Sequence, residues 1–249
     1  MPQRWKLTLE YDGRPFCGWQ RQENALTVQQ VVEEALTRFD GAAVPVAVAG
    51  RTDAGVHALG QVISADLSRD ATPDRVREAV NFHLKPHPVA VVDVQAVPAD
   101  FHARFWAQDR SYRYVIINRR PPLTVDEGLA WRVGAPLDIQ AMQTAANLLI
   151  GQHDFSTFRA AHCQASSPVK TLDRLDISRQ GERIEIKARA RSFLYHQVRN
   201  MVGTLALVGM GRWTHDAFAA AFAACDRRLG GPTAPPDGLY FTKVRYPAS

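Results

Sequence analysis

The chain contains few cysteines and no long apolar run. Its three cysteines, Cys17, Cys163 and Cys225, are widely separated and form no CxxC pair, which argues against both a disulfide framework and a zinc ribbon. No apolar stretch reaches the roughly 18 residues that a membrane helix needs. The N-terminus, MPQRWKLTLEYDG, lacks the charged, apolar and small-residue regions of a signal peptide. We therefore expect a soluble, cytoplasmic protein.

The overall composition is that of an ordinary globular protein. The 249 residues are 46% hydrophobic and 22% charged, which is enough for one large or two small domains. Lys and Arg number 30 against 25 acidic residues, for a net charge of +5, and 25 of the 30 basic residues are Arg. Because Arg pairs bidentately with phosphate and stacks on bases, this bias suits a nucleic-acid partner. A genomic preference for Arg codons explains it equally well.

Hydrophobic periodicity predicts the order β-α-β-β-α-β in the first half of the chain. We expect helices from the N-cap Thr27 to about Phe39 and from Thr72-Pro73 to about Leu84. The expected strands cover residues 5–11, 44–49, 61–67 and 89–97.

The same order is expected again after Arg110. Strands are predicted over 111–118, 172–179, 183–191 and 239–246, and helices over 139–150, 194–208 and 216–226. This pattern indicates an α+β fold with two ferredoxin-like halves, residues 1–106 and 107–249, although no sequence repeat accompanies it. Such halves form antiparallel sheets with helices on one face, and we expect a central basic cleft between them. Long loops over 119–130, 152–169 and 227–238 are candidates for binding.

A glycine-studded polar loop, Gly50 to Gln61, separates two of the expected strands. Within it, Asp53 lies two residues from Arg51, and a neighbouring cation keeps a carboxylate ionised and available as a nucleophile or base. The same letters are equally compatible with an Asx-turn and a surface ion pair.

Several segments decide between these readings. The loop sequence GRTDAGVHALGQV closely resembles the signature of the tRNA pseudouridine synthase A (TruA) family. The segments that also resemble this family, in order, are LTLEYDGRPFCGWQRQ (7–22), DFHARF (100–105), RSYRYVI (110–116), HDFSTFRA (153–160), FLYHQVRNMVG (193–203) and GLYF (238–241). The resemblance therefore spans nearly the whole chain.

The resemblance implies a reaction and its central residue. The family cuts the bond from C1′ of a uridine to N1, turns the base and rejoins C1′ to C5, with no cofactor. The essential aspartate matches Asp53, which acts either by attack at C1′ or by removing the C2′ proton. By the same resemblance, the substrate is tRNA, with target uridines at neighbouring positions on the 3′ side of the anticodon stem-loop, and the protein is a homodimer.

Three further residues match positions of the family's active site. Arg199 matches the arginine that pairs with the catalytic aspartate, and it lies off the apolar stripe of the helix expected over 194–208. Tyr112 matches the active-site tyrosine, whose ring stacks on the target base, whereas Tyr114 is a core candidate on the same strand face. Leu239 matches an apolar residue beneath the base. Without the resemblance, simpler interpretations would be preferred. Arg199 would be an exposed or phosphate-binding residue, and Tyr112 and Leu239 would be core residues.

Substrate contacts outside the chemistry are expected from basic and polar residues. The candidates for direct contact are Arg21, Gln22, His57, Arg104 and Arg110, and further arginines near the cleft are Arg113, Arg119, Arg120, Arg159, Arg189 and Arg191. His57, His162, Cys163 and His196 fit no standard zinc spacing, so we expect no metal site. One segment departs from the family pattern. In the family we expect Pro to follow Leu directly after the second helix, whereas in this chain Lys85 stands between Leu84 and Pro86.

Two other function classes fit parts of the same sequence. A non-catalytic RNA-binding protein built on two ferredoxin-like modules would explain the Arg-rich surface, although the RNP1 pattern of such modules is missing. A hydrolase of N-glycosidic bonds would use similar carboxylate chemistry at C1′ but would release free uracil.

Overall fold

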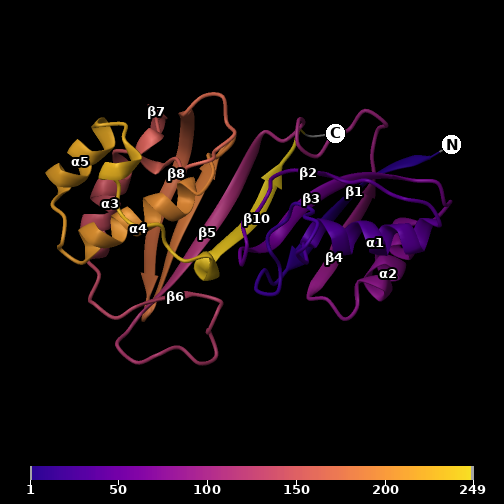
Figure 1. The fold of residues 1–249 in the computed structure, drawn as a ribbon, viewed down its shortest axis with the longest axis horizontal. Coiled ribbons are helices and arrows are strands. Elements are labelled where there is room, and N and C mark those ends of the chain that lie inside the picture. Colours follow the sequence, from indigo (N-terminus) through magenta and orange to yellow (C-terminus); the bar gives the residue numbers. More distant parts are fainter. Residues whose placement is uncertain (1, 248–249) are drawn as a thin grey trace. The chain divides into compact units, whose positions relative to one another are not determined.

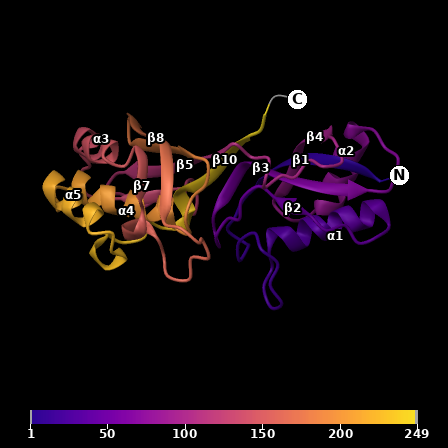
Figure 2. The same ribbon diagram turned by 90° about the horizontal axis from the view of Figure 1, so that it is seen from above.

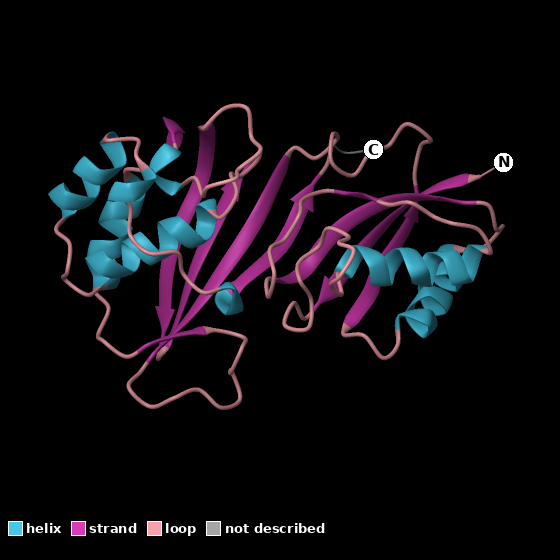
Figure 3. Cartoon of the chain, viewed as in Figure 1, coloured by secondary structure: helices cyan, strands magenta, loops and turns pink. Residues whose placement is uncertain are grey.

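A computed structural model describes residues 2–247, which form ten β-strands and five α-helices in a mixed α/β fold (Figures 1 and 3). Most strand pairs are antiparallel. Two compact units are present: unit 1 holds the described residues up to Arg110 and from Tyr240 onward, and unit 2 is Ser111–Leu239. The expected mixture of helices and antiparallel strands is confirmed, and the duplication of one ferredoxin-like plan stays a prediction. No helix within residues 2–247 is long and apolar enough to cross a membrane.

Unit 1 is a sheet with two helices. Its elements are β1 (Gln3–Tyr11), α1 (Val28–Asp40), β2 (Ala47–Val48), β3 (His57–Leu67), α2 (Pro73–Leu84), β4 (Val89–Ala96) and most of β10 (Leu239–Arg245). β1 lies between β4 and β3 and is antiparallel to both. The short β2 pairs with β3, and the first residues of β10 run parallel to the beginning of β3. α1 and α2 lie side by side (Figure 1).

The two helices of unit 1 begin at the residues that the sequence predicts. The Thr27 hydroxyl accepts a hydrogen bond from the Gln30 N–H, and the Thr72 hydroxyl accepts one from the Arg75 N–H. Each cap satisfies a backbone donor that has no partner within the helix. α1 ends at Gly41, whose φ of 87° a side chain would disfavour. Its buried face comprises Val28, Val31, Val32, Ala35, Leu36 and Phe39.

Two strands of unit 1 differ from the prediction. The β-branched run expected over 44–49 forms only the two-residue strand β2, which pairs with β3 through Ala47 and Val48, and the Ala49 N–H adds a single bond to the Val62 carbonyl at 2.9 Å. β3 begins at His57, four residues before the expected start at Gln61. The reason is pairing with a distant segment, since His57 and Ala58 face Tyr240 and Phe241 of β10. The loop that carries Asp53 is correspondingly shorter than expected.

Unit 2 contains the remaining elements. They are β5 (Asp109–Asn118, whose first two residues belong to unit 1), β6 (Trp131–Val133), α3 (Ile139–Asn147), β7 (Gly151–Asp154), β8 (Val169–Gln180), β9 (Arg183–Ala190), α4 (Gln197–Gly209) and α5 (His215–Ala223). Three short 3₁₀ turns are Ser156–Phe158, Arg227–Leu229 and Pro236–Gly238. The strand order is β5-β9-β8-β7, and β6 pairs with β5. Figures 1 and 2 show α3, α4 and α5 grouped together, and α3 also packs on β8.

Unit 2 corrects the sequence prediction at three places. β6 and β7 were not predicted, because each is only three or four residues long. α4 starts at Gln197 rather than Leu194, because His196 takes a left-handed conformation with φ of 59° and the Leu194 N–H donates to the Gln197 side chain. α4 is also buried on nearly all sides, so its polar residues Asn200 and Thr204 belong to the interior.

The Lys85–Pro86 peptide bond is cis, at the point where the chain departs from the family pattern. Just before it, the Asn81 side chain bonds both backbone groups of Val91, at 2.9 Å to the carbonyl and 2.7 Å from the N–H. This pair of bonds ties the end of α2 to β4.

Candidate active site

Asp53 lies on a tight loop between β2 and β3. Its side chain is half-buried, its neighbour Thr52 is buried, and Arg51 and Ala54 are exposed. The Val56 N–H donates to the Asp53 carbonyl at 3.1 Å, and Gly55 supplies a φ of 77° within this turn. The Asp53 side chain is therefore partly covered by protein and partly open to solvent.

The segment from Gly13 to Trp19 lies directly against this loop. The Trp19 N–H donates to the Thr52 carbonyl at 3.0 Å, and the Gly55 N–H donates to the Phe16 carbonyl at 3.3 Å. The two backbones approach so closely that there is no room for a side chain at position 18. A Cβ on Gly18, which has a φ of 88°, would lie 2.8 Å from the Thr52 carbonyl oxygen. The two sequence motifs that most resemble the family thus form one packed substructure.

The beginning of α1 supports that segment in turn. The Val28 and Gln29 N–H groups donate to the carbonyls of Gly18 and Trp19, at 3.2 Å and 3.0 Å. These are first-turn donors that the helix itself cannot satisfy. Trp19 is fully buried, and its ring centroid lies 6.2 Å from that of Tyr11. The first turn of α1 therefore helps to hold the Asp53 loop in place, through its bonds to Gly18 and Trp19.

A buried polar cluster fixes the loop from the sheet side. The hydroxyls of Tyr11 and Thr52 are 2.8 Å apart, and the Gln61 side-chain amide donates to the Gly50 carbonyl at 2.7 Å. The same amide lies 3.4 Å from the Tyr11 oxygen. Burial raises the pKa of Tyr11 to about 12, an effect that the hydrogen bonds with Thr52 and Gln61 only partly offset. The Tyr11 hydroxyl is thus protonated and neutral at physiological pH.

His57 occupies a structural position at the far end of the loop. Its side chain is only 2% exposed, and its ring stacks on Tyr240 with centroids 4.7 Å apart. The Gly13 N–H donates to Nδ1 at 3.1 Å, and Asp12 Oδ1 lies 3.3 Å from the same nitrogen. A side chain so deeply buried offers almost no surface to an RNA. His57 was expected to contact the substrate, but its burial and its contacts with Gly13 and Tyr240 make it a support of the loop instead.

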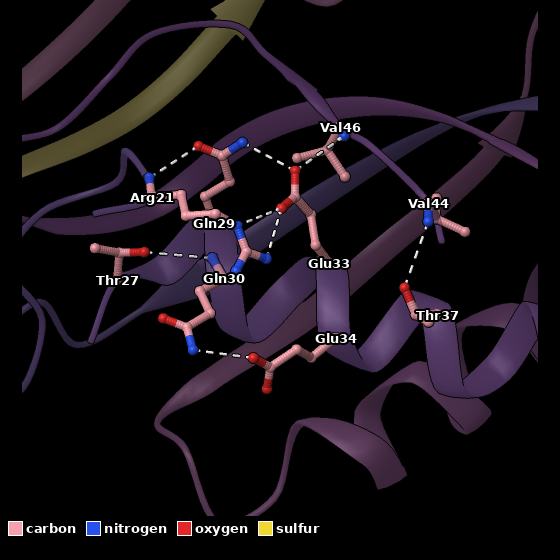
Figure 4. A network of polar contacts seen from close by, with 9 residues as sticks. All are labelled: Arg21, Thr27, Gln29, Gln30, Glu33, Glu34, Thr37, Val44 and Val46. Atoms are coloured by element: carbon pink, nitrogen blue, oxygen red, sulfur yellow. Dashed lines mark hydrogen bonds and ion pairs between the residues drawn. The ribbon is translucent and has the colours of Figure 1, made fainter. Parts of the chain in front are cut away.

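Arg21 and Gln22 lie beside α1, and each has partners within unit 1. Figure 4 shows Arg21 and Gln29 both reaching toward Glu33; the Arg21 guanidinium is 2.8 Å from one Glu33 oxygen and the Gln29 amide 2.9 Å from the other. The Arg21 N–H also donates to Gln29. Gln22 donates to the Cys17 carbonyl at 2.9 Å. An open depression of about 530 Å³ adjoins Arg21 and α1. Glu33 offsets the charge of Arg21, which weakens its attraction for phosphate.

Arg110 holds two backbone segments together. Its Nη2 donates to the carbonyls of both Ala49 and Arg104, each at 2.8 Å, and its Nε donates to Ala49 at 3.0 Å. Ala49 immediately precedes the Gly50–Gln61 motif. Arg104 itself is exposed, with its guanidinium 5.8 Å from the centre of the Phe105 ring.

Tyr112, Arg199 and Leu239 belong to unit 2. The ring of Tyr112 is half-buried and meets the edge of Phe193 at 5.1 Å. Arg199, on α4, donates from Nε to the Ala234 carbonyl at 2.8 Å, and the Ala234 N–H returns a bond to the Arg199 carbonyl. Leu239 is buried at the start of β10.

Tyr114 is a core residue, as the sequence suggested. Its side chain is completely buried, and its hydroxyl donates to the Pro235 carbonyl at 2.7 Å. Burial raises its pKa well above the usual value, and Arg199 partly counteracts that rise. Gly238 lies so close that a Cβ there would be 2.6 Å from the Tyr114 ring.

Most of the other arginines proposed for RNA binding already have protein partners. Arg113, Arg119 and Arg189 face Glu185, Glu182 and Asp173 at 3.7, 3.3 and 4.0 Å. Arg159 donates to the carbonyls of Cys163 and Ala165. Arg120 and Arg191 are exposed. The expected basic surface is therefore smaller than the arginine count suggests.

Sequence reasoning missed the buried polar residues that hold these segments. Tyr11 was taken only as a strand residue and Asn200 only as part of a motif. Asn200 donates to the Phe158 carbonyl at 2.9 Å and accepts from Thr233 and Arg227 at 2.6 and 3.2 Å. The signal that could have found Asn200 is a side-chain amide in a helix most of whose residues are apolar. Within residues 2–247, the His, Cys, Asp and Glu side chains form no group that could hold a metal ion.

Comparison with known proteins gives a consistent picture. A family model described as tRNA pseudouridine synthase matches residues 8–106 and 145–247. Proteins named tRNA pseudouridine synthase A from Rhodospirillum centenum and Rhodospirillum rubrum are 62% and 59% identical over 244 residues; each match covers 98% of this chain, and 100% and 88% of the relatives. The corresponding protein of Rhizorhabdus wittichii is 58% identical over 245 residues, covering 98% of this chain and 96% of the relative.

Proposed function

The chain belongs to the tRNA pseudouridine synthase family, and from that premise we propose that it isomerises uridines on the 3′ side of the tRNA anticodon stem-loop, at positions 38, 39 and 40, with Asp53 as the essential carboxylate. Members of this family are isomerases that act on tRNA uridine. Substrate and product are isomers, so the reaction needs no net oxidant, reductant or group donor.

The observation that carries this proposal is the way unit 1 holds the Asp53 loop. Backbone bonds from Trp19, a buried hydroxyl pair at Thr52 and the Gln61 bond to Gly50 fix it from three directions. A carboxylate held in one place can meet the ribose of a bound nucleotide without first being ordered, which lowers the entropic part of the barrier.

The chemistry proposed for Asp53 takes one of two forms. In the first, a carboxylate oxygen attacks C1′ as the C1′–N1 bond breaks, and the base, after turning, displaces it through C5. In the second, the carboxylate removes the C2′ proton as the base departs, and later returns it. In both forms the C5 proton must leave to restore the aromatic base, and N1, which has lost its bond to C1′, must gain a proton, so that the product remains an isomer of the substrate. We propose, from the family resemblance, that Tyr112 contacts the base and assists this last step.

Other residues are assigned supporting parts. Arg199 is proposed to keep the reacting carboxylate in its ionised form, and Leu239 to offer an apolar surface to the base. Arg51, two residues before Asp53, is proposed as a catalytic residue that supplies positive charge beside the carboxylate. Arg21, Gln22, Arg104 and Arg110 are proposed as tRNA contacts or as supports of the segments that make them. We further propose that the protein acts in the cytoplasm as a homodimer, which light scattering of the purified protein at micromolar concentration would test.

The deciding experiment compares Asp53→Asn with Asp70→Asn on unmodified tRNA. Asp70 is an exposed carboxylate of the same unit and serves as the matched control. We expect Asp53→Asn to lower the rate of pseudouridine formation by at least about 10³-fold, because it removes the reacting group. Its tRNA affinity should stay within a few fold of wild type, because one carboxylate contributes little to binding.

The alternatives give different outcomes in the same assay. A binding protein would form no pseudouridine and would be indifferent to Asp53→Asn. A glycosidase would release free uracil, which chromatography of the reaction mixture would detect. Substantial turnover by Asp53→Asn would refute the assignment of Asp53, and modification mapped to another arm of the tRNA would refute the proposed positions.

A further inference from the structure

The loop between β4 and β5 carries exposed aromatic side chains next to an arginine. Phe105 is 74% exposed and Trp106 38%, and they adjoin Arg104 and the half-buried His102. Resting on the proposed function, we propose that residues 102–106 form a stacking platform that receives an unpaired base of the bound tRNA close to the target uridine.

The backbone of this loop is firmly held, so the exposed rings are not the side chains of a flexible segment. Ala103 is completely buried; its N–H donates to the Ser64 hydroxyl at 3.2 Å, and its carbonyl accepts from the Tyr246 hydroxyl at 2.7 Å. The Trp106 N–H closes a turn onto the His102 carbonyl at 3.0 Å. Binding a base here would therefore cost little ordering of the protein.

Two of the rings already pack against each other in a tilted pair. The centroids of His102 and Phe105 are 4.3 Å apart with an interplanar angle of 36°. The Arg104 guanidinium lies 5.8 Å from the centre of the Phe105 ring. Trp106 meets the buried Phe101 edge-on at 5.5 Å, which fixes its orientation. Unpaired bases stack on such aromatic rings and on arginine planes, and every base has a face that can do so.

Arg104 carries a charge that no ion pair compensates in the described part of the chain. Among residues 2–247, no carboxylate forms an ion pair with the Arg104 guanidinium, unlike those of Arg21 and Arg119, which face Glu33 and Glu182. A cation next to exposed aromatic rings suits a nucleotide, whose base can stack while its phosphate meets the guanidinium. An apolar protein partner would have to desolvate that charge without a counter-ion.

The platform lies close to the catalytic loop in the same unit. Arg110 Nη2 is 2.8 Å from the Arg104 carbonyl and 2.8 Å from the Ala49 carbonyl, so these two oxygens lie within two hydrogen-bond lengths of each other. Asp53 follows Ala49 by four residues, a length of chain that spans at most about 14 Å. A nucleotide near the target uridine in the same stem-loop is therefore within reach of the platform.

The test compares Phe105→Ala with Phe82→Ala. Phe82 is a matched control, because it is also a highly exposed phenylalanine of unit 1 (70%) with a neighbouring histidine ring at 5.4 Å. We expect Phe105→Ala to raise the Kd for unmodified tRNA by about 5- to 100-fold, the effect of losing one stacked base, and Phe82→Ala to leave it unchanged. Phe105→Tyr should restore affinity to within about threefold of wild type, because its ring stacks equally well.

A salt series separates stacking from charge. Phe105→Ala should leave the dependence of log Kd on log salt unaltered, whereas Arg104→Ala should reduce its slope by about one. Equal tRNA affinity in wild type, Phe105→Ala and Phe82→Ala would overturn the platform. So would a change of molecular mass in Phe105→Ala by light scattering, because a second copy of the chain would then cover these rings. The proposed function, on which the platform rests, is tested separately: it fails if the wild-type protein forms no pseudouridine in tRNA.

Discussion

The hydroxyl oxygens of Tyr11 and Thr52 lie 2.8 Å apart in the interior of unit 1 and join the end of β1 to the residue before Asp53. The two residues are 41 positions apart in the chain. This bond makes the position of Asp53, the carboxylate proposed to react, depend on the sheet and not only on the loop's own turn. The interior of unit 1 and the Asp53 loop are thereby coupled.

Removing either hydroxyl should weaken both stability and activity. Tyr11→Phe and Thr52→Val each leave one buried hydroxyl without this partner, and we expect each to lower the free energy of unfolding by about 1–3 kcal/mol. The double variant should lose less than the sum, because one interaction is removed only once. Urea denaturation of the four proteins gives this coupling. Strict additivity would show that the hydroxyls do not depend on each other.

Gly18→Ala should damage the site, whereas Gly41→Ala should cost only stability. The two glycines have nearly the same φ, 88° and 87°, so both variants carry the strain of a left-handed alanine, about 1 kcal/mol. A Cβ at Gly18 would also lie 2.8 Å from the Thr52 carbonyl oxygen, whereas at Gly41 it would meet nothing within 4 Å. Turnover under conditions where both variants are folded should fall at least about tenfold for Gly18→Ala alone. Equal turnover would mean that this contact does not position the loop.

Asn200→Ala should strongly destabilise unit 2. Asn200 is buried and bonds Phe158, Thr233 and Arg227, so the substitution leaves a backbone carbonyl, a hydroxyl and a guanidinium without that partner. We expect the free energy of unfolding to fall by about 2–4 kcal/mol. The control is Asn147→Ala at the exposed end of α3, with an effect below about 0.5 kcal/mol. Similar melting temperatures for the two variants would contradict this account.

Stability should fall in alkaline solution between about pH 10 and pH 12. Burial raises the pKa of Tyr11 to about 12, above the value near 10 of an unfolded tyrosine. The unfolded chain therefore loses this proton first, and stability that is fully present below pH 10 is lost as the pH rises toward 12, at up to about 1.4 kcal/mol per pH unit. Burial also raises the pKa of Tyr114 and Tyr246, which act in the same direction. Denaturation of wild type and Tyr11→Phe across this range should show a shallower decline in the variant.

Local signals account for what could be predicted in the first half of the chain. The N-caps Thr27 and Thr72 and the apolar spacing of α1 act within a few residues, so they can be recognised in the sequence directly. The loop motif around Asp53 is likewise contiguous. These features, with the family resemblance, were sufficient to predict the two helices, the main strands and the candidate carboxylate.

Tertiary structure decided where distant segments meet. The sequence order suggested halves divided at residues 106 and 107, but packing groups residues 240–247 with unit 1, where Tyr240 and Phe241 pair with the start of β3. The same pairing buries His57 against Tyr240, so a polar residue of the motif supports the loop from within instead of facing solvent. Gly18 against Thr52 is a similar contact across the chain. Such contacts depend on backbone approach and burial between segments far apart in sequence, which neither periodicity nor capping encodes.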